Sequence, residues 1–154
     1  MKPLDSIDHK ILNILQGDST MAVKEIAEKV GLSFTPTYER IKNLRQNGII
    51  EKYVALVNHE KAGFELMAYC NILLKEQSQD KLHEFEISIG QHHQVLEVVS
   101  LSGTYDYMIK VVVRSIKDYN KFMTEIVANI PNVYQYHSNI VLAVAKNETK
   151  LNFE

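Results

Sequence analysis

Residues 24–50 constrain the fold of this chain most, because two helical patterns meet there across a short turn. In the first pattern, Ile26, Ala27 and Val30 share one helical face. Gly31 follows directly, and glycine readily takes the left-handed backbone that ends helices. We therefore expect the first of the two helices to end at Gly31.

The second helical pattern begins almost at once. Ser33 can cap it by accepting a backbone N–H, and Pro36 lies within the first turn, where a missing N–H costs little. Ile41 and Leu44 continue an apolar face, and Gly48 can end the helix. Two helices joined by so short a turn are typical of the helix-turn-helix that binds DNA.

The overall charge gives no support for a nucleic-acid partner. Seventeen Lys and Arg residues stand against nineteen Asp and Glu, which gives a formal net charge of -2. Positive charge gathers locally instead, since residues 40–52 hold four basic residues and one acidic residue. The basic side chains thus lie on the second helix and just after it.

A single cysteine, Cys70, lies in an apolar run and has no partner in the chain. This excludes an intramolecular disulfide and a cysteine-based metal cluster, and it predicts a buried thiol. The six histidines show no metal-binding spacing, so neither a metal nor a cofactor is expected. Neither an apolar signal segment nor a run of eighteen apolar residues is present, which predicts a cytoplasmic protein with no membrane partner.

The N-terminal part contains one more helix. Asp5 can cap it, and apolar residues recur at helical spacing until Gly17. Residues 49–57 are β-branched and aromatic and predict a connecting strand, while the polar segment around Gly63 indicates a boundary. The expected division is a helix-turn-helix domain over 1–50, a linking strand and hinge over 51–64, and a second domain over 65–154.

The second half reads as β-α-β-β-α-β. The expected elements are strands at 66–75, 94–102, 104–113 and 133–145, and helices at 79–90 and 116–129. This order is that of the ferredoxin-like fold, an antiparallel four-stranded sheet with both helices on one face. Apolar strand residues that could fall on the open face are Tyr69, Val111, Val113, Ile140 and Leu142. An exposed apolar face of this size usually indicates a partner, and a second copy of the chain is the simplest one.

Three segments resemble the Lrp/AsnC family, the leucine-responsive and asparagine-responsive or feast/famine transcriptional regulators. They are LDSIDHKILNILQGDS, GLSFTPTYERIKNLRQNGIIEKYVALVN and SLSGTYDYMIKV, and the resemblance covers nearly the whole chain. It implies an α+β protein, with a winged-type helix-turn-helix joined by a strand to a ferredoxin-like βαββαβ domain. It also implies a regulator, not an enzyme, that binds double-stranded DNA, forms a homodimer that often assembles into octamers, and binds an amino acid between subunits.

The second helix of the motif supplies the candidate DNA contacts. Arg40 and Asn43 suit base edges, where a bidentate contact contributes about 1–3 kcal/mol, whereas Lys42 and Arg45 suit phosphates. Alternatively, Arg40 pairs with a nearby glutamate in a solvated face. The candidate DNA-binding residues are Ser33, Thr35, Pro36, Thr37, Glu39, Arg40, Lys42, Asn43 and Arg45. Because the first sixty residues carry no net charge, we expect affinity to come from several such helices on one oligomer.

The turn SLSGTYDY could hold both ends of an amino acid. Gly103 lets a ligand approach the backbone, nearby N–H groups could hold a carboxylate, and Asp106 offers a carboxylate to an ammonium group. Alternatively, the turn is a tight hairpin in which Asp106 bonds backbone amides. Together with the resemblance, the turn gives the candidate effector residues Ser100, Gly103, Thr104, Tyr105, Asp106, Ile116, Asn139 and Ile140. A polar Asn139 favours a polar effector such as asparagine, glutamine or a basic amino acid.

Two other functions stay open at this point. A few relatives of the family, the sirohaem decarboxylases, keep the two-domain form for tetrapyrrole chemistry, but Arg114 is the only arginine in the second half to meet a polycarboxylate. The chain could also be an amino-acid sensor that acts through a protein partner, because Glu39 repels phosphate and the first half is neutral.

Overall fold

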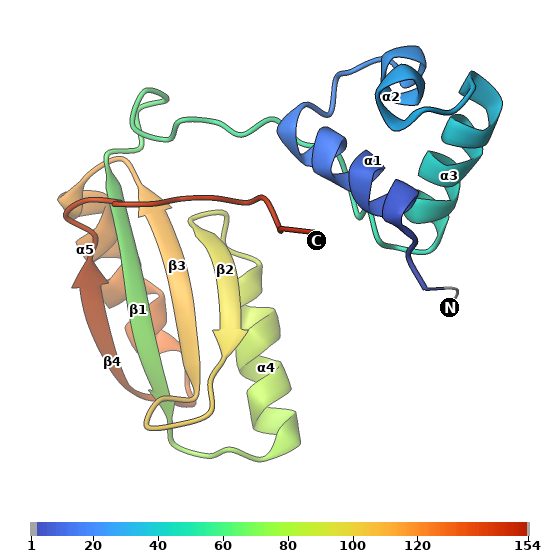
Figure 1. The fold of residues 1–154 in the computed structure, drawn as a ribbon. Coiled ribbons are helices and arrows are strands. Elements are labelled where there is room, and N and C mark those ends of the chain that lie inside the picture. The colour runs from blue at the N-terminus through green and yellow to red at the C-terminus, as the bar shows by residue number, and fades with distance from the viewer. Residues whose placement is uncertain (1–2, 154) are drawn as a thin grey trace. The chain divides into compact units, whose positions relative to one another are not determined.

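A computed structural model describes residues 3–153 and divides the chain into two compact units (Figure 1). The first unit runs up to Leu56 and also takes the segment from Ala145 onward, whereas the second unit is Val57–Val144. The last residues of the expected 65–154 domain thus belong to the first unit. Within the described residues, no helix combines the length and the apolar character needed to cross a membrane.

Three helices form the first unit: α1 (Ser6–Gly17), α2 (Val23–Val30) and α3 (Phe34–Gln46). Asp5 caps α1 through a capping box with Asp8, as the sequence indicates for its start. Gly31 ends α2 in left-handed backbone with φ of 72°, which confirms the predicted stop. The small core draws side chains from all three helices: Ile11, Leu12, Leu15, Ile26, Val30, Ile41 and Leu44.

Ser33 stands at the N-cap of α3, as predicted, but its hydroxyl makes no capping hydrogen bond. The predicted strand over 49–57 is absent, since residues 51–58 form no ladder and are all exposed. A strand requires a neighbour to pair with, and none of residues 3–153 pairs with that segment. The β-branched and aromatic composition of the segment therefore did not predict its structure.

The C-terminal segment lies along α1 within the first unit. The Gln16 amide donates to the Leu151 carbonyl at 3.0 Å and accepts from the Leu151 N–H at 2.7 Å. The Asn13 amide donates to the Phe153 carbonyl at 3.2 Å, and the Phe153 ring lies 5.4 Å from the ring of His9. Phe153 also packs against the core of the first unit, so the tail completes this unit.

The second unit has the predicted ferredoxin-like architecture. Its elements are β1 (Leu66–Leu74), α4 (Gln79–Gly90), β2 (Val95–Ser100), β3 (Tyr107–Val113), α5 (Ile116–Glu125), a 3₁₀ turn η1 (Val127–Asn129) and β4 (Val133–Ile140). The strands pair antiparallel in the order β2-β3-β1-β4, and Figure 1 shows α4 and α5 on the same face of the sheet. Phe85 of α4 and Phe122 of α5 pack onto that face, so the helices bury one side of every strand pair.

The register corrects which residues lie on the open face. Cys70 is buried toward the helices, as predicted, and its neighbour Tyr69 points to the other face. Val111 pairs with Ala68, and Val113 pairs with Leu66, so both valines share the covered face and are buried. Ile140 also pairs with Ala68 and lies at the rim of the covered face. The predictions for Val111, Val113 and Ile140 were wrong because the sequence alone does not fix the strand register. Successive residues of a strand point to opposite faces, so an error of one residue assigns a side chain to the wrong face.

We expect Phe153→Ala to loosen α1, because the ring packs on that helix and on the core of the first unit. Partial burial of an aromatic side chain stabilises by about 1–2 kcal/mol, so exchange of the α1 amides should speed up about 5- to 30-fold. Hydrogen exchange followed by mass spectrometry measures this locally. Lys146→Ala, an exposed change in the same tail, is the control. Equal protection of α1 in both variants would contradict a packed tail.

Candidate DNA-binding surface and effector site

The buried face of α3 fixes which of its side chains can meet a ligand. Thr37, Ile41 and Leu44 are buried against the other helices. Thr37 is 0% exposed, and its hydroxyl donates to the Ser33 carbonyl at 3.0 Å. Thr37 therefore cannot contact DNA in this structure, and its inclusion among the candidate residues was wrong. The spacing of Thr37, Ile41 and Leu44 in the sequence already carried this signal.

Most of the other candidates on α3 are exposed. They are Ser33, Thr35, Pro36, Glu39, Lys42, Asn43 and Arg45. The Lys42 ammonium lies 3.7 Å from the Glu39 carboxylate, with both side chains about half exposed, so the pair is weak. The Arg45 guanidinium lies 5.6 Å over the ring of Tyr53. Lys42 and Arg45 are thus accessible cations on this helix.

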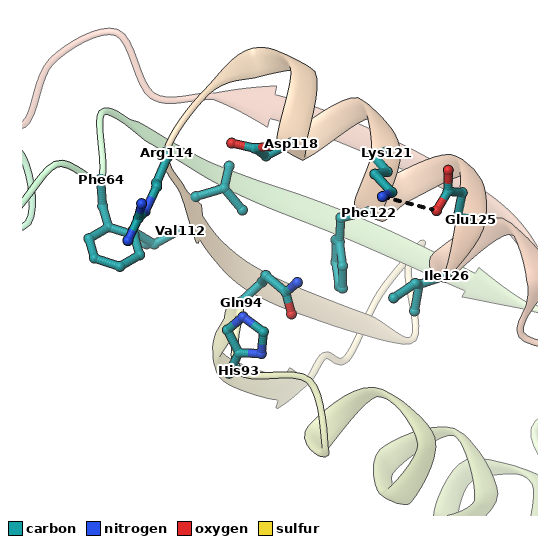
Figure 2. A pocket seen from close by; sticks show the side chains of 11 residues that line it. Phe64, His93, Gln94, Val112, Arg114, Asp118, Lys121, Phe122, Glu125 and Ile126 are labelled. Carbon is teal, nitrogen blue, oxygen red and sulfur yellow. Dashed lines mark ion pairs between the residues drawn. The ribbon is translucent and has the colours of Figure 1, made fainter.

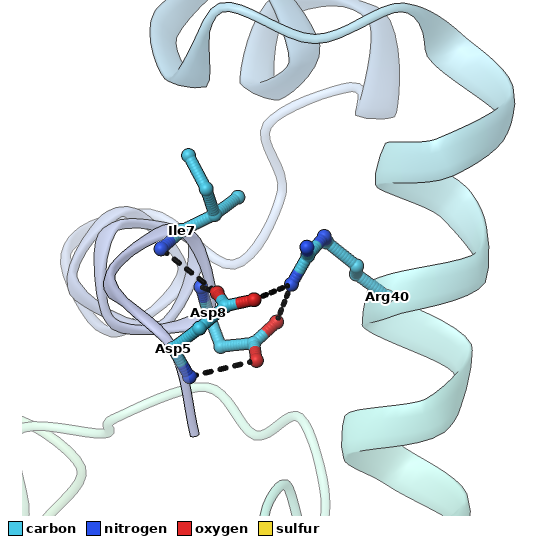
Figure 3. A network of polar contacts seen from close by, with 4 residues as sticks. All are labelled: Asp5, Ile7, Asp8 and Arg40. Atoms are coloured by element: carbon cyan, nitrogen blue, oxygen red, sulfur yellow. Dashed lines mark hydrogen bonds and ion pairs between the residues drawn. The ribbon is translucent and has the colours of Figure 1, made fainter. Parts of the chain in front are cut away.

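Arg40 lies in an acidic setting (Figure 3). Its Nη1 donates to Asp5 and to Asp8, each at 2.7 Å, and the Arg40 side chain is only 31% exposed. These two hydrogen bonds raise the pKa of Arg40, the bond to Asp5 more than the bond to Asp8. The alternative of an internal ion pair therefore describes this structure, with aspartates in place of the expected glutamate. Arg40 connects α3 to the start of α1.

Asp5 has two roles in this network. Its carboxylate accepts from the backbone N–H groups of Ile7 and Asp8, both at 2.9 Å, and also from Arg40. The Asp8 N–H and then the Arg40 guanidinium lower the pKa of Asp5 from 3.8 to about 2. One carboxylate thus caps a helix and holds the arginine of another helix.

The hairpin between β2 and β3 carries Asp106. Asp106 Oδ2 accepts from the Leu74 N–H at 2.7 Å, and the Asp106 N–H donates to the Ile72 carbonyl at 3.0 Å. One carboxylate oxygen therefore holds the hairpin to β1. This agrees with the alternative in which Asp106 bonds backbone amides. Gly103 has a φ of 147°, which other residues rarely adopt, so the turn depends on glycine.

The eight candidate effector residues fall into two groups within the second unit. Asn139 pairs with Tyr69 near the start of β1, whereas Asp106 bonds Leu74 at the end of β1. Five residues of strand separate Tyr69 from Leu74, which amounts to about 17 Å. Ser100, Gly103, Thr104, Tyr105 and Asp106 form the hairpin group, and Ile116, Asn139 and Ile140 form the opposite group. One chain alone does not bring the two groups around one small ligand.

A pocket that the sequence did not indicate lies between β3, α5 and the residues before β2 (Figure 2). Its volume is about 320 Å³. Arg114 lies at one side, 5.7 Å over the ring of Phe64, while Lys121 and Glu125 lie within 4.0 Å of each other on α5. The buried Oε1 of Gln94 accepts no hydrogen bond from any described residue. Charges of both signs beside an apolar wall suit a small zwitterion. The lining residues come from four separate segments, namely Phe64, 93–94, 112–114 and 118–126, so no local sequence pattern indicates the pocket.

No group of three histidine, cysteine, aspartate or glutamate side chains within residues 3–153 could hold a metal ion.

Comparison with known proteins decides the family. The model of the Lrp/AsnC ligand-binding domain matches residues 67–151, and the model of a winged helix-turn-helix DNA-binding domain matches residues 4–51. The chain belongs to the Lrp/AsnC family. Its relatives are DNA-binding transcriptional regulators, not enzymes, so the decarboxylase alternative is not favoured.

Two curated relatives of this Lrp/AsnC protein align over almost its whole length. The HTH-type transcriptional regulator FL11 of Pyrococcus horikoshii is 34% identical over 149 residues, which are 97% of this chain and 96% of FL11. The leucine-responsive regulatory protein of Escherichia coli is 31% identical over 150 residues, 97% of this chain and 92% of that protein.

Solved structures of the family agree with the fold. A transcriptional regulator from Neisseria meningitidis in complex with L-Met superimposes with a TM-score of 0.91 at 28% identity, covering 97% of this chain and 96% of that one. An AsnC family transcriptional regulator from Agrobacterium tumefaciens gives a TM-score of 0.90 at 34% identity, covering 96% of each chain. The Lrp/AsnC arrangement of a helix-turn-helix and a ferredoxin-like domain is therefore present.

The low pKa of Asp5 predicts how stability depends on pH. A carboxyl whose pKa falls from 3.8 to about 2 on folding stabilises the folded state above pH 4, and this contribution is lost as the pH falls toward 2. Asp5→Asn should therefore be less stable than the wild type above pH 4, and the difference should vanish near pH 2. Denaturant unfolding followed by circular dichroism between pH 2 and 6 measures it.

Arg40→Gln provides the comparison for Asp5→Asn. It should flatten the pH dependence only in part, because the Asp8 N–H, the larger cause of the low pKa, still bonds Asp5. Parallel stability curves for the wild type and Asp5→Asn between pH 2 and 6 would contradict the role of this carboxylate.

Proposed function

We propose that the exposed surface of α3 binds double-stranded DNA by sequence and that the Lrp/AsnC domain adjusts this binding in response to an amino acid. The observation that supports the first part most is the contrast among three basic residues of α3. Lys42 and Arg45 are accessible cations, whereas Arg40 is held by two aspartates. We therefore propose that Lys42 and Arg45 contact DNA phosphates. Arg40 instead positions α3 on α1.

The remaining contacts follow from side-chain chemistry. The hydroxyls of Ser33 and Thr35 are exposed at the start of α3 and suit phosphates, and the exposed amide of Asn43 suits an adenine edge. Pro36 is exposed in the first turn, and Glu39 partly offsets the charge of Lys42. The proposed DNA-binding residues are Ser33, Thr35, Pro36, Glu39, Lys42, Asn43 and Arg45.

Salt dependence tests the proposed phosphate contacts. Each phosphate contact contributes about -0.9 to the slope of log K against log salt, so Lys42→Gln and Arg45→Gln should each reduce the slope by about 0.9 per bound α3. Anisotropy titrations of the full chain against a duplex selected from a random library measure this. Lys10→Gln, an exposed change on α1, is the matched control and should leave the slope unchanged.

Arg40→Gln separates positioning from contact. Because Arg40 is engaged with Asp5 and Asp8, its loss should weaken DNA binding and lower thermal stability while the salt slope stays unchanged. A slope reduced by Arg40→Gln and left intact by Lys42→Gln and Arg45→Gln would reverse the assignment.

We further propose that the effector is an amino acid held between copies of the chain. Its support is the L-Met complex of the Neisseria relative and the spacing of the candidate residues in this structure. The hairpin group around Asp106 and the group around Asn139 lie about 17 Å apart along β1, too far for one amino acid within one chain. A homodimer or a larger assembly, such as an octamer, would let one group meet the other from a second copy.

Thermal-shift screening with the twenty amino acids tests the effector site. A ligand at 100 times its Kd should stabilise the folded chain by about 2.7 kcal/mol. Asp106→Asn keeps an acceptor for the Leu74 N–H but removes the charge, so it should abolish the shift. Arg114→Gln, in the separate pocket, should retain the shift. A shift lost only in Arg114→Gln would move the effector to that pocket, and no shift at all would contradict an amino-acid effector.

A further inference from the structure

Two exposed aromatic side chains lie in the N-terminal part of α3, the helix that we propose binds DNA. Phe34 is 55% exposed and Tyr38 is 48% exposed, although both are large and apolar. Their rings stack, with centroids 6.1 Å apart and an angle of 10° between the planes. Neither ring belongs to the apolar core of the first unit. The pair therefore lies outside that core and leaves apolar surface open to a partner.

The charges around α3 indicate which partner this is. At 100° per residue, Phe34, Tyr38, Lys42 and Arg45 lie within an arc of about 80° on one flank of the helix. The opposite flank carries Arg40 with its two neutralising aspartates. One flank is thus apolar and cationic, and the other carries net negative charge. A polyanion is attracted to the first flank and repelled by the second.

DNA offers one apolar group that aromatic carbon can recognise by sequence. In the major groove, the C5-methyl group of thymine is the apolar feature among the base edges, and phenylalanine contacts it favourably. The N-terminal residues of a reading helix are those that meet base edges, and Phe34 is the first residue of α3. Lys42 and Arg45 lie two to three turns later on the same flank, where a strand of phosphates borders the groove.

We propose that Phe34, held in place by the stacked ring of Tyr38, reads thymine methyl groups in the major groove. This inference rests on the DNA-binding function and adds a base identity to it. Phe34 makes the apolar contact, and Tyr38 limits the rotamers of Phe34. The sequence alone predicts base recognition by Arg40 and Asn43 and does not indicate a role for the two aromatic residues.

Selection from a random duplex library tests the proposal with the full chain. The wild type should enrich duplexes with a thymine at one fixed position of each half-site. Phe34→Ala should lose the preference at that position and keep the preferences at the others. Replacing that thymine by deoxyuridine, which lacks only the methyl group, should weaken wild-type binding about fourfold, as expected for one buried methyl group. The same replacement should leave the binding of Phe34→Ala unchanged.

Two further variants complete the test. Gln46→Ala changes an exposed residue at the other end of α3 and should discriminate thymine from deoxyuridine as the wild type does. Tyr38→Ala should retain part of the discrimination, because Phe34 remains but loses its stacking partner. Phe34→Ala should still unfold in one cooperative thermal transition, because Phe34 lies outside the core.

The possible failures can be told apart. If Phe34→Ala still discriminates thymine from deoxyuridine, or if the wild type discriminates at no thymine, the methyl contact is refuted while DNA binding stands. Phe34→Ala could also weaken binding to the thymine and deoxyuridine duplexes by the same factor and so discriminate between them as the wild type does. Phe34 would then support DNA binding in general, and the proposal would also be refuted. A wild type that enriches no duplex would overturn DNA binding itself.

Discussion

The hydrogen bonds from Arg40 to Asp5 and Asp8 determine how α3 is presented. They connect the middle of α3 to the first turn of α1, across more than thirty residues of sequence. The guanidinium faces α1 on one flank of α3, the buried face of α3 packs on the other helices, and Lys42 and Arg45 lie exposed on the other flank. The buried core of the three helices supports the same arrangement, since it draws side chains from α1, α2 and α3. The proposed DNA-binding surface of α3 uses that orientation.

The effector site depends on a constraint of a different kind. A β-strand is stiff and has a fixed rise, so residues that meet opposite ends of β1 cannot approach each other within one chain. Asp106 and Asn139 are such residues. Under the proposed function, one chain holds only part of the effector site, and a second copy supplies the rest.

Local patterns predicted the helices and the order of the elements well. The predicted helix over 79–90 coincides with α4, and Gly31 ends α2 as expected. The predictions that were wrong concerned contacts between residues far apart in the sequence. The segment 49–57 has the composition of a strand but no neighbour to pair with, and the ion pairs of Arg40 link residues far apart in sequence. Thr37 is a different case, because helical spacing already placed it with the buried Ile41 and Leu44.

The tail along α1 means that the DNA-binding unit is not a continuous stretch of sequence. A fragment that ends at residue 56 would contain all three helices and the capping box, yet it would lack the Leu151 and Phe153 contacts that cover α1. Cutting the chain once, in the segment after α3, would not free the unit either, because the tail would still join it to β4. Dissection of this protein into independent parts therefore requires a circularly permuted or two-piece design.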